Sequence, residues 1–121
     1  MSRKVLVIDD EFDFVDAIRM RLEANGYEVI GAHNGLEGVE KARHELPGLI
    51  LLDLVMPKSN GFETLSKLKS DPQVSRIPVV IITAKSDTEY VFDAGKLGAD
   101  DFIIKPVSME GVLDLVRTYV P

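Results

Sequence analysis

Three aspartates and two other polar residues stand where this sequence could do chemistry. Asp53 ends one apolar run, and Asp9 and Asp10 end another. Two further apolar runs also end in polar residues, one in Thr83 and the other in Lys105. If the four runs are parallel strands of one sheet, their carboxyl ends meet at the same edge. That edge would bring together three carboxylates, one hydroxyl and one ammonium group.

Such a set of groups suits phosphorylation of an aspartate with the help of a cation. Two carboxylates at ~4 Å repel by about 4 kcal/mol at an effective dielectric of ~20, so a cluster either protonates or binds a cation. Oxygen ligands alone favour a hard cation, Mg²⁺ before Ca²⁺. Asp53 could then accept a phosphoryl group as a mixed anhydride, while Lys105 and the cation neutralise the phosphoryl oxygens. Thr83 could donate a hydrogen bond to one of those oxygens.

Each of these residues also has an ordinary structural interpretation. Asp53 could form a turn, and Thr83 could cap a helix. The acidic residues 9–11 could simply charge the start of a helix, and Lys105 could be a solvated surface lysine. All of them, however, follow apolar runs at the same end, and this coincidence favours a common site.

Composition narrows the class of protein. The 121 residues suffice for one domain, 1–121, with a hydrophobic core, and the hydrophobic fraction of 45% argues against disorder. The absence of cysteine excludes disulfides, thiolate catalysis and zinc–thiolate sites. A net charge of −6 argues against direct binding of nucleic acid. No apolar stretch has the length of a signal peptide or a membrane span, so we expect a cytoplasmic protein with no membrane contact.

Short apolar runs alternate with segments of helical period, which is typical of β-α repeats and a parallel sheet. We expect strands at 4–8, 27–31, 48–52, 78–82 and 101–104. All except 27–31, which reads as a more exposed edge strand, are apolar enough to be covered on both faces. We expect helices at 12–24, 36–46, 61–71, 88–97 and 109–119. This pattern predicts a doubly wound α/β fold with its site at the carboxyl ends of the strands.

The motifs occur in a distinctive order along the chain. They are Asp9-Asp10, Asp53 with Met56-Pro57, Gly61, Thr83-Ala84, Gly98-Ala99-Asp100 and Lys105-Pro106. In this combination the sequence resembles, from end to end, the receiver domain of bacterial two-component response regulators. The resemblance implies a flavodoxin-like (βα)5 fold with a five-stranded parallel sheet of order 2-1-3-4-5. It also implies a signalling switch that promotes its own phosphorylation and slow autodephosphorylation, and not a turnover enzyme.

The resemblance assigns a role to each residue near the phosphorylation site. Asp53 would be the phosphoacceptor, and its donor would be a phosphohistidine of a sensor histidine kinase or a histidine phosphotransfer protein. Mg²⁺ would be held by Asp10, Asp53 and the backbone carbonyl of Val55, with Asp9 acting mainly through water. The Lys105-Pro106 peptide bond is a candidate for the cis form, which would fix where the lysine points.

The remaining assignments concern the response to phosphorylation. Thr83 and Lys105 would contact the phosphoryl oxygens, and Phe102 would turn inward as Thr83 moves. That motion would remodel the face made by the fourth helix, fifth strand and fifth helix, and so control a target protein, an effector domain or formation of a homodimer. From the residues alone, Phe102 reads instead as a strand aromatic packed in the core.

The resemblance also implies where a phosphodonor protein docks. The contact residues at the start of the first helix would be Asp13, Phe14 and Ala17. Phe14 has two interpretations, because the buried stripe of this helix already uses Val15, Ile18 and Leu22. It is either an exposed anchor for the partner or a side chain folded against its own helix.

Other functions fit the sequence less well. A phosphatase with an aspartyl-phosphate intermediate needs a second aspartate where Val55 stands. A flavin-binding module needs a loop rich in Ser, Thr and Gly where residues 9–11 are acidic. A purely structural pseudo-receiver lacks site residues that are all present here. Val55 and Lys85 occupy positions that control water access in the family, so the rate of dephosphorylation is open. Whether the chain is a stand-alone receiver or part of a longer regulator is also open.

Overall fold

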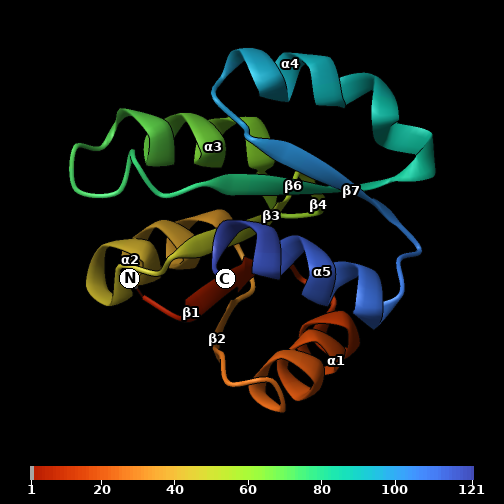
Figure 1. Cartoon of the computed structure of the whole chain (residues 1–121). Coiled ribbons are helices and arrows are strands. Elements are labelled where there is room, and N and C mark those ends of the chain that lie inside the picture. The colour runs from red at the N-terminus through yellow and green to blue at the C-terminus, as the bar shows by residue number, and fades with distance from the viewer. Residues whose placement is uncertain (1) are drawn as a thin grey trace.

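The computed structural model describes residues 2–121 as three layers, with a central sheet covered by helices on both faces (Figure 1). Five longer strands alternate with helical segments along the chain, and a short hairpin follows the third of these strands. In order they are β1 (Lys4–Ile8), α1 (Phe12–Glu23), β2 (Glu28–Ala32), α2 (Gly35–Glu45), β3 (Leu49–Asp53), β4 (Val55–Met56), β5 (Ser59–Asn60), α3 (Gly61–Ser70), β6 (Val79–Ala84), the 3-10 helix η1 (Lys85–Tyr90), α4 (Val91–Lys96), β7 (Asp101–Lys105) and α5 (Met109–Tyr119).

The five longer strands form one parallel sheet in the order β2-β1-β3-β6-β7. Since β3, β6 and β7 are the third, fourth and fifth of these longer strands, the predicted order 2-1-3-4-5 is confirmed. Strand β2 lies at an edge, as its sequence indicated. The two remaining strands, β4 and β5, form a separate antiparallel hairpin directly after β3.

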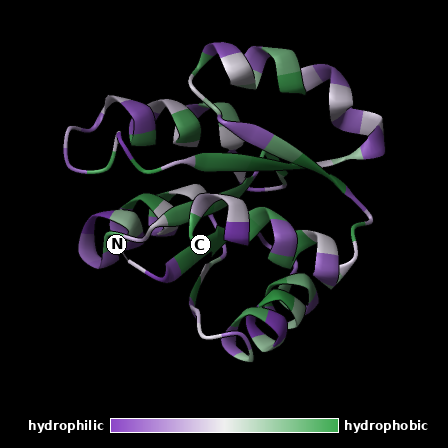
Figure 2. Ribbon diagram, viewed as in Figure 1, coloured by the Kyte–Doolittle hydropathy of each residue, from purple (hydrophilic) through white to green (hydrophobic). Residues whose placement is uncertain are grey.

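Successive residues of each inner strand pack into opposite layers, because side chains alternate along a strand. In β1, Val5 and Val7 pack into the core with α1 and α5, whereas Leu6 and Ile8 pack with α2 and α3. All four are completely buried. The strands in the middle of Figure 2 are accordingly hydrophobic, while the helices change character around their circumference. This two-sided burial fixes β1 and β3, and with them the carboxylates that follow.

Three helices begin at side-chain caps that their sequences contain. The Asn34 side chain accepts a hydrogen bond from the backbone N–H of Glu37 in α2. The Asn60 side chain accepts from two backbone N–H groups in α3, and the Ser108 side chain accepts from one in α5. Gly61, just after the second of these caps, lies against the backbone of Leu54, where a side chain would not fit. The start of α3 is therefore held directly against the segment that follows Asp53.

The fourth helical segment differs from the prediction of one α-helix over 88–97. It consists of a 3-10 helix, Lys85–Tyr90, in which no residue is buried, followed by the short helix α4 with only Ala94 buried. The short polar side chains of residues 86–88 compete for backbone hydrogen bonds, and little apolar surface fixes the segment against the sheet. The apolar pattern that predicted one continuous helix was too sparse to select it.

The fifth strand of the sheet, β7, also corrects an expectation. Its apolar sequence indicated a strand covered on both faces, but only Ile103 is buried, while Phe102 and Ile104 are 44% and 40% exposed. The reason is that β7 is an edge strand beside the short helix α4, which leaves part of its surface uncovered.

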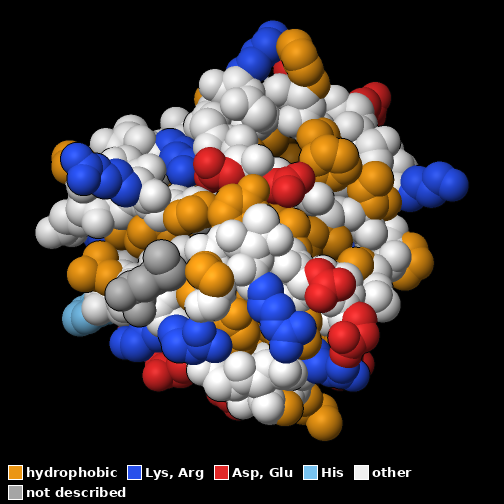
Figure 3. All heavy atoms as spheres, in the orientation of Figure 1, with side chains coloured by type: hydrophobic (Ala, Val, Ile, Leu, Met, Phe, Trp, Pro, Cys, Tyr) orange, Lys and Arg blue, Asp and Glu red, His pale blue; other side chains and the backbone are white. Residues whose placement is uncertain are grey.

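The described surface carries both signs of charge. On the face seen in Figure 3, Lys and Arg side chains are interspersed with Asp, Glu and apolar side chains. Within residues 2–121, each helix is too short or too polar to cross a bilayer.

Candidate functional site

Three aspartates meet at the carboxyl edge of the sheet, as the sequence predicted. Asp9 and Asp10 follow β1, and Asp53 ends β3, the strand that pairs directly with β1. Each of the three offers a carboxylate oxygen, and these oxygens lie within 4.8 Å of one another. Asp9 is completely buried and Asp53 is 7% exposed, whereas Asp10 is half-buried. The cluster is therefore a concentration of negative charge that is largely removed from water.

Burial and mutual repulsion change the protonation of these groups. Burial, followed by the charge of Asp9, raises the pKa of Asp53 to about 7. Burial also raises the pKa of Asp9, although hydrogen bonds from the Glu11 backbone and from Lys105 act in the opposite direction. Near neutral pH, Asp53 is therefore partly protonated in the cation-free site, and a bound metal ion would favour its ionised form. An all-oxygen cluster of this kind fits Mg²⁺ by its donor chemistry.

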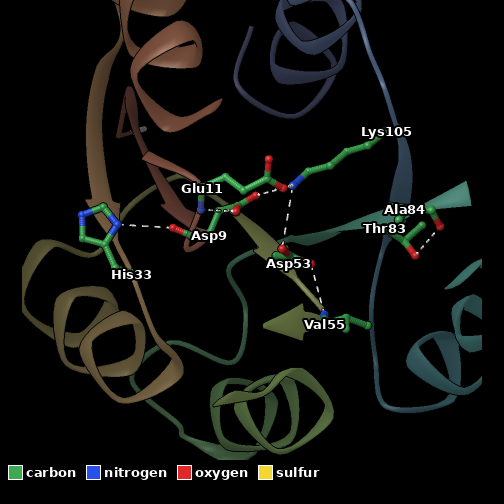
Figure 4. Close-up of polar contacts among 8 residues, drawn as sticks. All are labelled: Asp9, Glu11, His33, Asp53, Val55, Thr83, Ala84 and Lys105. Carbon is green, nitrogen blue, oxygen red and sulfur yellow. Dashed lines mark hydrogen bonds and ion pairs between the residues drawn. The ribbon is translucent and has the colours of Figure 1, made fainter. Parts of the chain in front are cut away.

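Lys105 reaches the cluster from the end of β7 (Figure 4). Its Nζ lies 3.0 Å from Asp9 Oδ2, 3.8 Å from Asp53 Oδ2 and 2.5 Å from Glu11 Oε1. Burial acts to lower the pKa of Lys105, but the hydrogen bonds with Glu11 and Asp9 outweigh it and raise the pKa. The lysine therefore stays charged. The peptide bond between Lys105 and Pro106 is cis, as the sequence suggested.

The two buried aspartates also make turn hydrogen bonds, which was the ordinary interpretation of Asp53 but not of Asp9. Asp53 Oδ1 accepts a hydrogen bond from the Val55 N–H at 3.1 Å, and Asp9 Oδ1 accepts one from the Glu11 N–H at 2.9 Å. These bonds use Oδ1 in each case and orient Oδ2 toward Lys105. The turn role and the clustering of charge thus coexist in the same side chains.

Thr83 lies on β6, the strand next to the one that carries Asp53, and Phe102 lies on β7, one strand further along the sheet. Thr83 is buried at the end of β6, and its hydroxyl donates to the Ala84 carbonyl oxygen at 3.2 Å. The residue at the N-cap of η1 is Ala84, without a side-chain cap, so Thr83 does not cap that helix. The core interpretation of Phe102 is wrong, because nearly half of its side chain is exposed.

The three candidate docking residues lie at the start of α1. Asp13 is exposed, and Ala17 is half-buried. Phe14 is also half-buried and packs against the core next to α1 and α5, which matches a side chain folded against the protein more closely than a free anchor. The Lys105 ammonium lies 4.5 Å from the centroid of its ring. Phe14 is thus part of the surroundings of Lys105.

Two residues near the cluster were missed in the sequence. Glu11 follows the aspartate pair and was interpreted only as charge at the start of a helix, yet it contacts Lys105. His33 follows the second strand, and its Nδ1 lies 3.3 Å from the Asp9 backbone oxygen (Figure 4). Its ring also stacks on Phe12, with centroids 4.0 Å apart. The available signal was position, because His33 comes directly after β2 and Glu11 lies in the loop that follows β1.

A groove of about 750 Å³ lies beside the cluster and is lined by residues of α2, α3 and the β4–β5 hairpin. Asp10 contributes to its wall. Two of the cations that line it are already paired, Arg43 with Asp71 at 2.5 Å and Lys67 with Glu63 at 3.2 Å. Asp10 is therefore the member of the acid cluster that borders open space.

Comparison with known proteins shows which family the chain is similar to. A family model described as the response regulator receiver domain matches residues 5–117. Protein PilH of Pseudomonas aeruginosa is 38% identical over 115 residues, which cover 94% of this chain and 94% of PilH. The alkaline phosphatase synthesis transcriptional regulatory protein PhoP of Bacillus subtilis is 42% identical over 109 residues, 89% of this chain and 44% of PhoP.

Solved structures show the same similarity. The chemotaxis response regulator CheY4 of Vibrio cholerae superposes with a TM-score of 0.89 at 27% identity, covering 98% of this chain and 99% of that one. The chain is thus similar to the whole of some relatives and to less than half of others.

Proposed function

Because the chain belongs to the response regulator receiver domain family of two-component signalling, we propose that it is a phosphorylation-dependent switch with Asp53 as its phosphoacceptor. The observation that carries the proposal is the cluster of Asp9, Asp10 and Asp53 with the Lys105 ammonium beside it. The phosphodonor is a phosphohistidine of a sensor histidine kinase or a histidine phosphotransfer protein. The chain is a signalling component and not a turnover enzyme.

The reaction is a transfer from nitrogen to oxygen. An Asp53 carboxylate oxygen forms a bond with phosphorus while the bond between phosphorus and the imidazole nitrogen breaks, and its electron pair stays on the nitrogen. The donor ring carries a proton on its other nitrogen when the bond breaks, so the products are an acyl phosphate on Asp53 and a neutral imidazole on the donor. Water later hydrolyses the acyl phosphate slowly, which releases inorganic phosphate and regenerates the carboxylate. The Val55 side chain, two residues after Asp53, is half exposed.

Mg²⁺ fits the donor set of this cluster. Asp10, Asp53 and the Val55 backbone carbonyl would hold the ion, and Asp9 would bind it mainly through water. When bound, the ion neutralises negative charge that develops on the phosphoryl oxygens. Lys105 supplies a second positive charge, and Thr83 donates a hydrogen bond after its hydroxyl leaves the Ala84 carbonyl oxygen.

The output is a change of the surface formed by α4, β7 and α5. Phe102 turns inward when Thr83 moves toward the phosphoryl group, and the remodelled face then binds a target protein, an effector domain or a second copy of the chain. The phosphodonor protein docks at the start of α1, over Asp13, Phe14 and Ala17. The net charge of −6 argues against direct binding of nucleic acid and so supports an output through protein contacts. We place this switch in the cytoplasm.

Intact-mass measurement tests this proposal directly. The protein should gain the mass of one phosphoryl group when incubated with Mg²⁺ and acetyl phosphate, and prior addition of EDTA should prevent the gain. Asp53→Asn should gain nothing, whereas Asp71→Asn, a change at an acid outside the cluster, should react as the parent does. If the parent binds neither a phosphoryl group nor beryllofluoride, the proposed switch is wrong.

A further inference from the structure

The Lys105 ammonium has two kinds of partner. Asp9 and Asp53 belong to the acid cluster. Glu11 and Phe14 do not, and both come from the start of α1. Glu11 Oε1 makes the shortest of the contacts at 2.5 Å, and the Phe14 ring centroid lies 4.5 Å from Nζ. Asp53, at 3.8 Å, is the most distant of the three carboxylates.

We propose that Glu11 and Phe14 form a holding site for the Lys105 ammonium that competes with the Asp53 phosphoryl site. This inference rests on the proposed function and concerns the regulation of the same site. In the holding position, the ammonium is bound by a carboxylate and by the negative face of an aromatic ring. To contact a phosphoryl group on Asp53, it must leave that carboxylate, so the holding site lowers the stability of the phosphorylated state.

The competition becomes stronger when a cation neutralises the acid cluster. A cation among Asp9, Asp10 and Asp53 weakens the attraction of Asp9 for the ammonium, because the charge of Asp9 is then compensated. Glu11 lies outside the cluster and keeps its charge. The ammonium of the unphosphorylated protein is therefore left with Glu11 and Phe14 as its main partners, and an incoming phosphoryl group has to draw it away.

The expected effect is moderate, because the pair is only partly shielded. The Glu11 side chain is 62% exposed, although that of Lys105 is 17% exposed. Partly exposed ion pairs change equilibrium constants by roughly two- to fivefold. Removal of the Glu11 charge should raise the affinity for beryllofluoride, which occupies the phosphoryl position, by about this factor.

The chain offers a matched control for the loss of one negative charge. Glu63 lies in the first turn of α3, its side chain is 63% exposed, and it pairs with its own lysine, Lys67, at 3.2 Å. Glu63→Gln therefore removes the same charge at the same exposure without contacting Lys105. A general gain in attraction for anions would affect both variants alike, whereas loss of the holding site would affect Glu11→Gln alone.

The first experiment locates the ammonium without any phosphorylation. Aromatic ring currents shift nearby protons, so the ε-methylene protons of Lys105 should resonate upfield of ordinary lysine values in NMR spectra of the full chain. Phe14→Leu should abolish this shift, and Glu11→Gln should reduce it, while Glu63→Gln leaves it unchanged. An ordinary Lys105 shift in the parent would show that the ammonium does not occupy the holding site, and the inference would be overturned.

The second experiment measures the competition in a double-mutant cycle. Beryllofluoride affinity in Mg²⁺ should rise about two- to fivefold in Glu11→Gln. In a protein that already carries Lys105→Met, the addition of Glu11→Gln should leave the beryllofluoride affinity unchanged, because the competing ammonium is gone. An equal rise in Glu63→Gln, or a rise that persists without Lys105, would assign the effect to charge alone and refute the holding site. Absence of any beryllofluoride binding to the parent would instead refute the proposed function, and the NMR result would still decide where the ammonium lies.

Discussion

At the scale of single residues, the site contains charged groups whose burial is unfavourable for the stability of the fold. Asp9 and Asp53 are buried carboxylates that repel each other, and Lys105 compensates only part of their charge. The pKa of Asp53, raised to about 7, measures the cost of its ionised form in the absence of a cation. A cation bound to the cluster would reduce this cost, because it favours the ionised form.

Asp53→Asn should therefore stabilise the cation-free protein above neutral pH. The folded protein binds more protons than the unfolded chain between the ordinary pKa of 3.8 and the raised value of about 7. Its free energy of unfolding consequently falls as pH rises through this window, and asparagine avoids the loss. We expect a gain of about 2 to 4 kcal/mol at pH 8 that vanishes near pH 4, measured by urea denaturation in EDTA.

Asp71→Asn provides a control of opposite sign. A side-chain hydrogen bond from Arg43 lowers the pKa of Asp71, so its contribution to stability is present above the ordinary pKa and is lost as pH falls. This variant should be less stable than the parent at pH 8, with the difference shrinking in acid. A gain for Asp53→Asn that is independent of pH would contradict the assigned cause, which is burial of a charge.

At the scale of elements, close packing of backbone positions the loop that follows Asp53. A Cβ atom on Gly61 would lie 2.7 Å from the carbonyl carbon of Leu54, and backbone cannot move aside as a flexible side chain can. Gly61→Ala should therefore destabilise the protein by about 1 to 3 kcal/mol in urea denaturation. Unchanged stability would show that the β4–β5 hairpin shifts freely.

Gly95→Ala should act in the opposite direction. Gly95 lies within α4, and a Cβ atom there would meet no other atom within 4 Å. Alanine costs less backbone entropy than glycine in a helix, so the variant should be about 0.5 to 1 kcal/mol more stable. The measurement is again urea denaturation. A loss of stability would indicate that α4 has a different conformation in solution.

The helices differ in how well the sequence predicted them. Helix α5 was predicted over its full length, because Val112, Leu113 and Val116 form a clear buried stripe, and the structure adds a side-chain cap at Ser108. The 3-10 helix and α4 were not distinguished, since their apolar pattern is sparse and few residues are buried. The contact between Glu11 and Lys105 joins residues 94 positions apart and depends on side-chain conformation, which periodicity does not encode.

At the scale of the whole molecule, the acid cluster and the exposed surface of β7 are connected through one strand. Asp53 is in register with Ile82 on β6, and β6 in turn pairs with β7, where Ile81 is opposite Phe102. Thr83, at the end of the intervening strand, is buried between the two regions. A phosphoryl group can shift the conformational equilibrium only if it binds one arrangement of Thr83 better than the other.

A tryptophan at position 102 would report that shift, because the chain contains no other tryptophan. The side chain at this position is 44% exposed, so acrylamide should quench the fluorescence of Phe102→Trp readily. Beryllofluoride with Mg²⁺ should reduce the quenching, since the bound anion draws the Thr83 hydroxyl from the Ala84 carbonyl oxygen and opens space for the ring. Adding Thr83→Ala should leave beryllofluoride binding measurable but abolish the change in quenching. If quenching stays constant in the parent variant while the anion binds, phosphorylation does not reach this face through Phe102, and the output surface must lie elsewhere on the molecule.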